Sequence, residues 1–269
     1  MIHPTAVVHD SVVLGKDVSI GAFCLVGAGV QLGDGCRLEP HAIVRDGCEI
    51  GAGAVLDSFV VVGGDAQMRV PDPAARGGRV AVGAGTILRE GVTVHRPSKP
   101  GGATEIGASC FLMAHSHVAH DCKVADNVTL ANGAMLGGHV FVGEWAFVGG
   151  GAGVHQFVRL GEGSMVAGNA AISYDVPPFS IAADRNDICG LNLVGLRRRG
   201  FAPEVMPDLK RCFRAVFGGV GNLREQAEKV LAAGELGTTP QGRAFLEFFA
   251  GGHRGFGHKR RPKRGEHGE

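Results

Sequence analysis

A six-residue repeat runs through most of the chain and limits the folds that it can adopt. Ile, Leu or Val begins each of 26 hexads, from Ile2 to Val62, from Val82 to Val94 and from Ile106 to Ile172. The fifth residue of a hexad is small or β-branched, and Gly or another small residue usually follows the aliphatic one. A period of six fits neither a helix of period 3.6 nor the two-residue alternation of a simple strand.

Short strands joined by corners and wound into a prism explain this period, with the aliphatic residue on the inner line. If three hexads make one coil, the 26 hexads form between eight and nine coils. The composition agrees, because 45 glycines and only 6% aromatic residues suit short strands with many tight turns. The period alone does not reveal the hand of the coil.

Hexads of the form aliphatic-Gly-x-x-small-x resemble those of the left-handed β-helix acyltransferases, from Ile2 to about Ile172. The resemblance implies a mainly β fold, a left-handed parallel β-helix of hexapeptide repeats. We expect this domain to occupy residues 1–190, with loops at 63–80 and 97–105 where the repeat is interrupted. Long loops at solenoid corners are either tolerated insertions or carriers of function.

Other features narrow the class of protein. No apolar run reaches about 18 residues, and the N-terminus lacks the charged and apolar regions of a signal peptide. We therefore expect a cytoplasmic protein without an integral membrane segment. Most cysteines occupy the fifth hexad position, so we interpret them as small inward-facing residues and not as nucleophiles or disulfide partners; these are Cys24, Cys36, Cys48, Cys110 and Cys122.

Four histidines are predicted to line one edge of the prism. If the two loops bulge out between neighbouring coils, one column contains the hexads that begin at Val62, Val94, Val118, Leu136 and Val154. The first loop leaves the coil from this column. The histidines of the column come from successive coils and lie beside the inward position: His95, His120, His139 and His155. His115 belongs to the preceding hexad, and its role stays open.

The residue types in this column suit proton transfer to and from a hydroxyl group. A neutral histidine can remove a proton near neutral pH, and a carboxylate such as Asp121 beside His120 can orient it and stabilise its charged form. Gly138 precedes His139 one coil away, where a backbone N–H could face a developing oxyanion. No activated serine or cysteine is apparent, which favours direct attack by an acceptor hydroxyl over a covalent acyl-enzyme.

Several motifs resemble the UDP-N-acetylglucosamine 3-O-acyltransferases of lipid A biosynthesis. They are HVAHDC at 117–122, GGHV at 137–140, VHQF at 154–157, DVPP at 175–178 and GLRRRGF at 195–201. The resemblance implies that His120 is the general base, that Asp121 assists it and that the Gly138 amide forms the oxyanion site. It implies substrate contacts for the following residues: Gln67, His117, His139, His155, Gln156, Asn192 and Arg198. We expect His95 to contact substrate as well, because it belongs to the same column.

The same resemblance implies the substrates and the assembly. The donor would be a 3-hydroxyacyl group on the phosphopantetheine of acyl carrier protein, the acceptor UDP-N-acetylglucosamine, and the assembly a homotrimer with sites between subunits and no further cofactor or metal. Gly168 matches the position that limits acyl length, and a glycine there favours a longer chain. Met68, Val70 and Val194 depart from the family pattern near the sugar, so the acceptor atom, a 3-hydroxyl or a 3-amine, stays open.

The C-terminal part differs in pattern and charge. Apolar residues at mixed three and four spacing predict a small α-helical domain at 191–250, with helices at Pro203–Phe217, Asn222–Ala233 and Thr239–Phe249. Residues 1–191 carry 12 Lys and Arg against 18 Asp and Glu, whereas residues 192–269 carry 15 against 8. This domain would cap the solenoid and attract an acidic carrier protein. We expect the basic tail, 251–269, to be disordered and not to bind nucleic acid.

Three alternatives compete with this interpretation. A zinc enzyme of the carbonic-anhydrase kind uses histidines five apart on the same fold, as His115 and His120 are. A non-catalytic solenoid scaffold would leave the column of histidines unexplained. A sister acyltransferase would use another acceptor, such as a 3-amino UDP-sugar.

Overall fold

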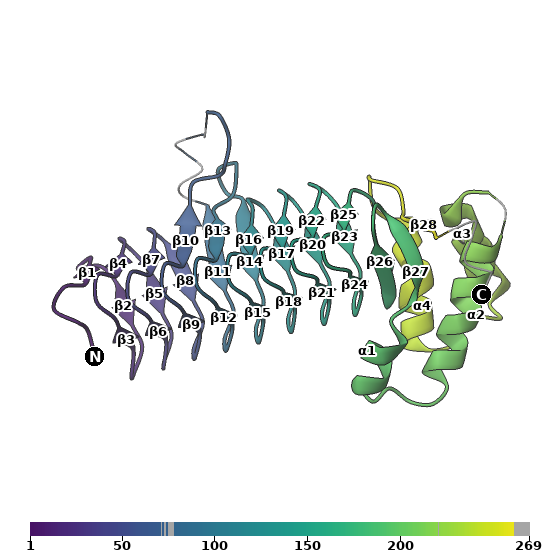
Figure 1. Ribbon diagram of the computed structural model, residues 1–269, viewed down its shortest axis with the longest axis horizontal. Helices are drawn as coiled ribbons and strands as arrows, with labels where there is room; N and C mark the ends of the chain where they lie inside the picture. Colours follow the sequence, from purple (N-terminus) through teal and green to yellow (C-terminus); the bar gives the residue numbers. More distant parts are fainter. Residues whose placement is uncertain (71, 73, 75–77, 220, 261–269) are drawn as a thin grey trace, which may run out of the picture.

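The chain forms the predicted left-handed parallel β-helix, with a small helical region at its C-terminal end (Figure 1). The computed structural model describes residues 1–70, 72, 74, 78–219 and 221–260. Short strands repeat along three walls of a prism, and the helices stand at one end of it. In these described residues no helix is both long and apolar enough to cross a membrane.

The first wall of the prism is a nine-stranded parallel sheet that bears the predicted column. Val62 pairs with Val94, Val94 with Val118, and Val118 with Leu136. The predicted stacking is thus confirmed, and the two loops bulge out between coils as expected. The strands in spatial order are β1 (Val7–Val8), β4 (Leu25–Val26), β7 (Ile43–Val44), β10 (Val61–Gly64), β13 (Thr93–His95), β16 (His117–Val118), β19 (Met135–Leu136), β22 (Gly153–Val154) and β25 (Ala171–Ile172).

The other two walls complete each coil. The second wall has eight strands: β2 (Val13–Leu14), β5 (Gln31–Leu32), β8 (Cys48–Ile50), β11 (Arg79–Val82), β14 (Ala103–Ile106), β17 (Lys123–Val124), β20 (Phe141–Val142) and β23 (Arg159–Leu160). The third wall has eleven: β3 (Ser19–Ile20), β6 (Arg37–Leu38), β9 (Val55–Leu56), β12 (Ile87–Leu88), β15 (Phe111–Leu112), β18 (Thr129–Leu130), β21 (Phe147–Val148), β24 (Met165–Val166), β26 (Ser180–Ala183), β27 (Asp187–Leu191) and β28 (His258–Lys259).

The interior of the prism is apolar, as the repeat predicts. The aliphatic residues that begin the hexads are buried from Ile20 onward, whereas Leu14 in the first coil is exposed. The five cysteines at the fifth position are buried beside them. Burial raises the pKa of Cys122 to about 12, so its thiolate is not populated at neutral pH.

The solenoid continues beyond Ile172, where the sequence pattern predicted that the repeat ends. Val176 bridges to Leu160, and β26 pairs in parallel with β24. An antiparallel partner, β27, then covers this last strand. The step from Ile172 to Val176 is four residues instead of six, so the hexad pattern does not reveal the added strands.

The helical region contains four α-helices: α1 (Leu193–Arg198), α2 (Val205–Gly218), α3 (Leu223–Ala233) and α4 (Pro240–Glu247), followed by a 3-10 turn at Phe248–Ala250. Asn222 and Thr239 accept hydrogen bonds from backbone N–H groups as N-caps of α3 and α4, which explains where these helices begin. The three predicted helices are present with shifted ends, and α1 was not predicted as a separate helix.

The prediction that the whole tail is disordered is wrong for residues 251–260. This segment returns to the solenoid, where β28 pairs with β27 and Phe256 bridges to Asp175. Its backbone hydrogen bonds to the last coil outweigh the polar composition that suggested disorder. Residues 261–269 lie outside the described part of the chain, and the domain limits at 190 and 250 stay predictions.

A buried ion pair joins the solenoid to the helical region. The Asp175 side chain is fully buried and accepts hydrogen bonds from the Arg159 backbone N–H (2.8 Å) and from its Nε (2.7 Å). The Arg159 guanidinium also lies over the ring of Phe248, 4.1 Å from its centroid, and donates to the Phe248 carbonyl oxygen. The last coil and the end of α4 are therefore held by one arginine.

Asp175→Ala is expected to lower the free energy of unfolding by about 3 kcal/mol, because removing one partner leaves a partly buried charge unpaired. Urea denaturation followed by circular dichroism measures this. The control is Glu247→Ala, whose pair with Arg243 is exposed on α4 and contributes about 0.5 kcal/mol or less. Equal losses in the two variants would show that the Arg159–Asp175 pair does not hold the joint.

Candidate active site

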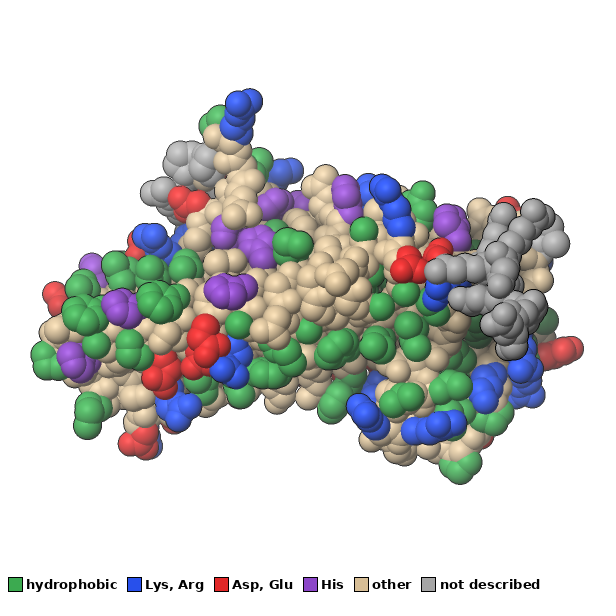
Figure 2. Space-filling model, viewed as in Figure 1, with side chains coloured by type: hydrophobic (Ala, Val, Ile, Leu, Met, Phe, Trp, Pro, Cys, Tyr) green, Lys and Arg blue, Asp and Glu red, His purple; other side chains and the backbone are tan. Residues whose placement is uncertain are grey.

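A groove runs across the first wall where the predicted site residues gather. It encloses about 600 Å³ along β16, β19, β22 and β25. Its floor consists of small or apolar side chains, while histidines and the loop residue Gln67 stand at its sides. In Figure 2 the histidines (purple) gather on the solenoid around the base of the projecting loop. The predicted residues that line the groove are Gln67, His117, His120, Gly138 and His155.

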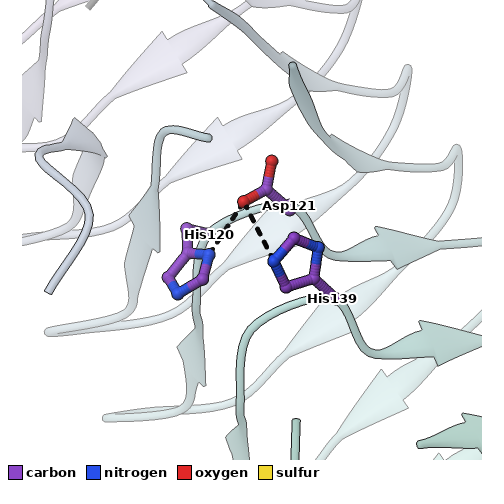
Figure 3. Close-up of side chains that lie close together, drawn as sticks. All are labelled: His120, Asp121 and His139. Atoms are coloured by element: carbon purple, nitrogen blue, oxygen red, sulfur yellow. Dashed lines mark hydrogen bonds and ion pairs between the residues drawn. The ribbon is translucent and has the colours of Figure 1, made fainter. Parts of the chain in front are cut away.

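Asp121 is the centre of a hydrogen-bond network at the edge of this wall (Figure 3). Its Oδ2 lies 2.8 Å from His120 Nδ1 and 3.5 Å from His139 Nε2. The same oxygen accepts hydrogen bonds from the backbone N–H (3.0 Å) and the hydroxyl (2.6 Å) of Ser98. The Asp121 backbone N–H donates to Thr104 Oγ1 at 2.8 Å. Ser98, His120 and His139 thus contact one carboxylate, and Thr104 holds the backbone that bears it.

The charge of Asp121 follows from two opposing effects. Burial alone would raise the pKa of Asp121, but the hydrogen bonds from Ser98 and His120 outweigh it and keep the pKa below its ordinary value. Asp121 is therefore a carboxylate at neutral pH and can only accept hydrogen bonds. Its contact with His120 Nδ1 requires a proton on that nitrogen, which leaves the lone pair of the neutral ring on Nε2.

Gly138 lies directly against the His120 ring. A Cβ atom at this position would come 2.4 Å from His120 Cε1 and 2.6 Å from its Nε2, so a side chain there would displace the ring. The Gly138 carbonyl oxygen accepts a hydrogen bond from the Phe157 backbone N–H. The backbone at Gly138 therefore approaches the nitrogen that can accept a proton.

Two further histidines lie at the N-terminal side of His120. His117 Nδ1 is 2.8 Å from Thr93 Oγ1, and the His95 and His117 rings meet edge to face with centroids 5.0 Å apart. Burial, followed by the neighbouring His95 and His120, lowers the pKa of His117 to about 4. Burial also lowers the pKa of His95. Both rings are neutral hydrogen-bonding groups at pH 7.

His139 and His155 occupy the C-terminal side of the network. The His139 ring stacks on Phe157, with centroids 4.5 Å apart and planes 7° from parallel, and burial lowers its pKa. His155 is exposed, and its Nδ1 lies 3.1 Å from the Nη2 atom of Arg254. Gln156, also exposed, follows it in the same corner.

Six predicted substrate residues do not line the groove: His95, His139 and Gln156, which lie near it as described above, and Gly168, Asn192 and Arg198. Asn192 caps α1, because its side chain accepts from the Gly195 N–H and donates to the Gly163 carbonyl oxygen. Arg198 is exposed at the end of α1, which Figure 1 shows on the side of the prism away from the projecting loop. Gly168 lies in the turn before β25, where an added Cβ would meet the Gly150 carbonyl oxygen at 3.3 Å.

Sequence reasoning missed Ser98, Arg185 and Arg254. Ser98 lies in the predicted loop at 97–105, whose role stayed open, and no pattern indicated that this loop folds back onto Asp121. Arg185, in the turn between β26 and β27, lines the groove. Arg254 belongs to the segment that was predicted to be disordered.

The zinc alternative also has a geometric counterpart. Among the described residues, ligand atoms of His120, Asp121 and His139 lie within 4.8 Å of one another, close enough to hold a metal ion. His115, which the zinc hypothesis paired with His120, is exposed at a corner beside Gly91 and does not join this group. The spacing of five residues therefore does not form the expected ligand pair.

Comparisons with known proteins agree over nearly the whole chain. The family model described as UDP N-acetylglucosamine O-acyltransferase, domain 2, matches residues 175–257, and the bacterial transferase hexapeptide model matches residues 29–64 and 103–138. A relative from Campylobacter concisus, named acyl-(acyl-carrier-protein)–UDP-N-acetylglucosamine O-acyltransferase, is 40% identical over 86% of this chain and 88% of its own. A relative of the same name from Sinorhizobium fredii is 38% identical over 93% of this chain and 92% of its own.

Solved structures give the same result. The UDP-N-acetylglucosamine acyltransferase from Campylobacter jejuni is 35% identical and superposes with a TM-score of 0.88, covering 97% of this chain and 100% of that one. The Francisella novicida enzyme is 31% identical with a TM-score of 0.89, covering 98% and 95%. The chain therefore belongs to the UDP-N-acetylglucosamine O-acyltransferase family and is an O-acyltransferase.

Proposed function

We propose that this enzyme transfers a 3-hydroxyacyl group from acyl carrier protein to the 3-hydroxyl of UDP-N-acetylglucosamine, the first step of lipid A biosynthesis. Family membership supports the substrates, since the relatives' names include both the carrier and the nucleotide sugar. The hydrogen bond between Asp121 and His120 Nδ1, beside an apolar groove, is the observation that carries the proposal. That the reaction takes place in the cytoplasm stays an expectation from the sequence.

His120 acts as the general base in this mechanism. Its Nε2 lone pair takes the proton of the sugar 3-hydroxyl while that oxygen attacks the thioester carbonyl carbon of the donor. Asp121 accepts the hydrogen bond from Nδ1–H and stabilises the imidazolium that forms. When the tetrahedral intermediate collapses, the C–S bond breaks and the imidazolium returns the proton to the phosphopantetheine sulfur.

The Gly138 amide serves as the donor to the negative oxygen of the tetrahedral intermediate. In the described part of the chain its N–H donates to no other group, and its backbone lies against the His120 ring. A preorganised N–H at this place stabilises charge that develops only in the transition state. Because Gly138 has no side chain, the His120 ring and the Gly138 N–H can both lie close to the thioester carbonyl carbon.

The groove floor suits an acyl chain. The outward positions of successive strands are Met135, Gly153 and Ala171, so the floor is apolar and becomes shallow only at the methionine. Gly168, in the turn before β25, lies outside the groove formed by one chain, and only the family resemblance supports its role in favouring a longer 3-hydroxyacyl group. A 3-amino UDP-sugar stays the alternative acceptor, because Met68, Val70 and Val194 depart from the family pattern.

A homotrimer would complete this site. Asn192 and Arg198, which the family pattern assigns to substrate, are not part of the groove formed by one chain. A neighbouring subunit could supply them if the groove faced the next solenoid. The basic helix α2 would attract the acidic carrier protein, and exposed Lys210, Arg211 and Arg214 contribute to its charge.

His120→Ala is expected to lower kcat by about 10²–10⁴-fold, the usual contribution of a general base. Transfer of 3-hydroxyacyl groups of several lengths from acyl carrier protein to UDP-N-acetylglucosamine measures it, with the 3-amino sugar as a parallel acceptor. His115→Ala, an exposed histidine outside the groove, is the matched control and is expected to keep wild-type activity. Full activity of His120→Ala would show that another group is the base.

Ser98→Ala is expected to lower kcat roughly tenfold, because Asp121 loses one of its charge-assisted hydrogen bonds. Since this bond lowers the pKa of Asp121, its loss raises that pKa, and activity should decline at a higher pH as the solution is acidified. A kcat–pH profile measures both effects. Ser98→Thr retains the hydroxyl and should restore the profile; an unchanged profile in Ser98→Ala would remove Ser98 from the mechanism.

The metal alternative predicts a different result. In the proposed mechanism Asp121, His120 and His139 bind one another and no metal ion. Dialysis against a strong chelator should therefore leave transfer activity unchanged. Elemental analysis of the purified protein should find far less than one zinc ion per chain. Stoichiometric zinc, together with loss of activity on chelation and recovery on zinc addition, would support a metal-dependent enzyme at His120, Asp121 and His139.

A further inference from the structure

One charged contact crosses from the C-terminal segment to the groove. Arg254 Nη2 lies 3.1 Å from His155 Nδ1, and Arg254 Nε donates to the Ser173 carbonyl oxygen at 3.3 Å. His155 and Ser173 both line the groove, and Arg254 is half-buried against them. An arginine from the last described segment of the chain thus contacts a histidine of the proposed site.

This contact determines which nitrogen of His155 carries the proton. A guanidinium has five N–H donors and no acceptor, so His155 Nδ1 must accept the hydrogen bond. Its proton is then on Nε2. The Gln156 carbonyl oxygen, 3.2 Å from the same Nδ1, would favour the opposite tautomer, because a carbonyl can only accept. The bond from the charged donor is the stronger of the two.

The position of Arg254 is fixed by the backbone on its C-terminal side. The Asp175 N–H donates to the Gly255 carbonyl oxygen at 2.9 Å, and the Gly257 N–H donates to the Asp175 carbonyl oxygen at 3.0 Å. The Asp175 side chain is itself held by Arg159. Figure 1 shows this segment, in yellow, passing beside the end of β25 before it enters β28. The guanidinium is therefore anchored to the last coil.

We propose that Arg254 is a positioning residue that holds His155 as the Nε2–H tautomer, so that His155 donates a hydrogen bond to an oxygen of the bound nucleotide sugar. The kind of oxygen this donor recognises is a phosphate, carbonyl or hydroxyl acceptor. The identity of the ligand rests on the proposed function, whereas the tautomer does not. Without Arg254, the neighbour of His155 Nδ1 described above would be the Gln156 carbonyl oxygen, which favours the Nδ1–H form.

Two measurements on the full-length enzyme test this proposal. The first is the tautomer of His155 from long-range nitrogen–proton NMR correlations of the imidazole, assigned by loss of the signal in His155→Asn. Wild type should show the Nε2–H form, and Arg254→Met should show the Nδ1–H form or a mixture. Arg254→Lys, which keeps a cationic donor, should restore the Nε2–H form. An Nδ1–H form in wild type, or the same tautomer in Arg254→Met, would overturn the proposal.

The second measurement compares the effects of substitution on KM and on kcat. Arg254→Met should raise KM for UDP-N-acetylglucosamine about tenfold, with kcat little changed, because one hydrogen bond to substrate is lost. Arg260→Met is the matched control six residues further on, where the arginine pairs with exposed Asp184. Arg254→Met combined with His155→Asn should be no worse than His155→Asn alone; additive losses would show that Arg254 does not act through His155. If wild type does not use this acceptor at all, the proposed function fails, and the tautomer measurement still decides the role of Arg254.

Discussion

Backbone hydrogen bonding between successive coils is the constraint on which the rest of this structure depends. Leu136 pairs with Val118 on one side and with Val154 on the other, so residues eighteen positions apart become neighbours. Neighbouring strands in a sheet lie about 4.8 Å apart, and the stacked rings of His139 and Phe157, eighteen residues apart, accordingly have centroids 4.5 Å apart. A shift of one hexad in this register would move His139 to a different wall of the prism and dismantle the network around Asp121.

The corners of the coil explain why the polar site can form on such an apolar framework. Asp121, His139 and Phe157 occupy equivalent corner positions and have positive φ angles of 59°, 60° and 66°. Asp and His tolerate this left-handed conformation better than most residues, whereas Phe rarely adopts it. Phe157 is stabilised there by stacking on His139. Because corner side chains follow the edge of the prism, they can meet one another without entering the core.

Much of the fold and part of the site could be predicted from the sequence, because both follow from counting hexads. The column of histidines needed only the period of six, whereas the pairing of His120 with Asp121 was expected from the residue types and the family resemblance. The contact of Ser98 with Asp121 could not be predicted, because the composition of a loop does not reveal which residues its backbone will pack against. The strands after Ile172 were not predicted, because the step from Ile172 to Val176 breaks the six-residue period. Arg254 was not predicted, because the glycine content and the charged residues of its segment suggested disorder. Backbone hydrogen bonds to Asp175 order this segment.

The electrostatics around His120 agree with its proposed role as a base that is paired with a single carboxylate. Burial lowers the pKa of His95, His117 and His139, so these rings add no positive charge beside His120 at neutral pH. Asp121 stays ionised because Ser98 donates to it twice. A proton that arrives at His120 therefore meets one fixed negative charge and neutral neighbours, instead of a cluster of cations that would repel it. The same burial that makes three histidines neutral thus leaves the ionised Asp121 as the charged hydrogen-bond partner of His120.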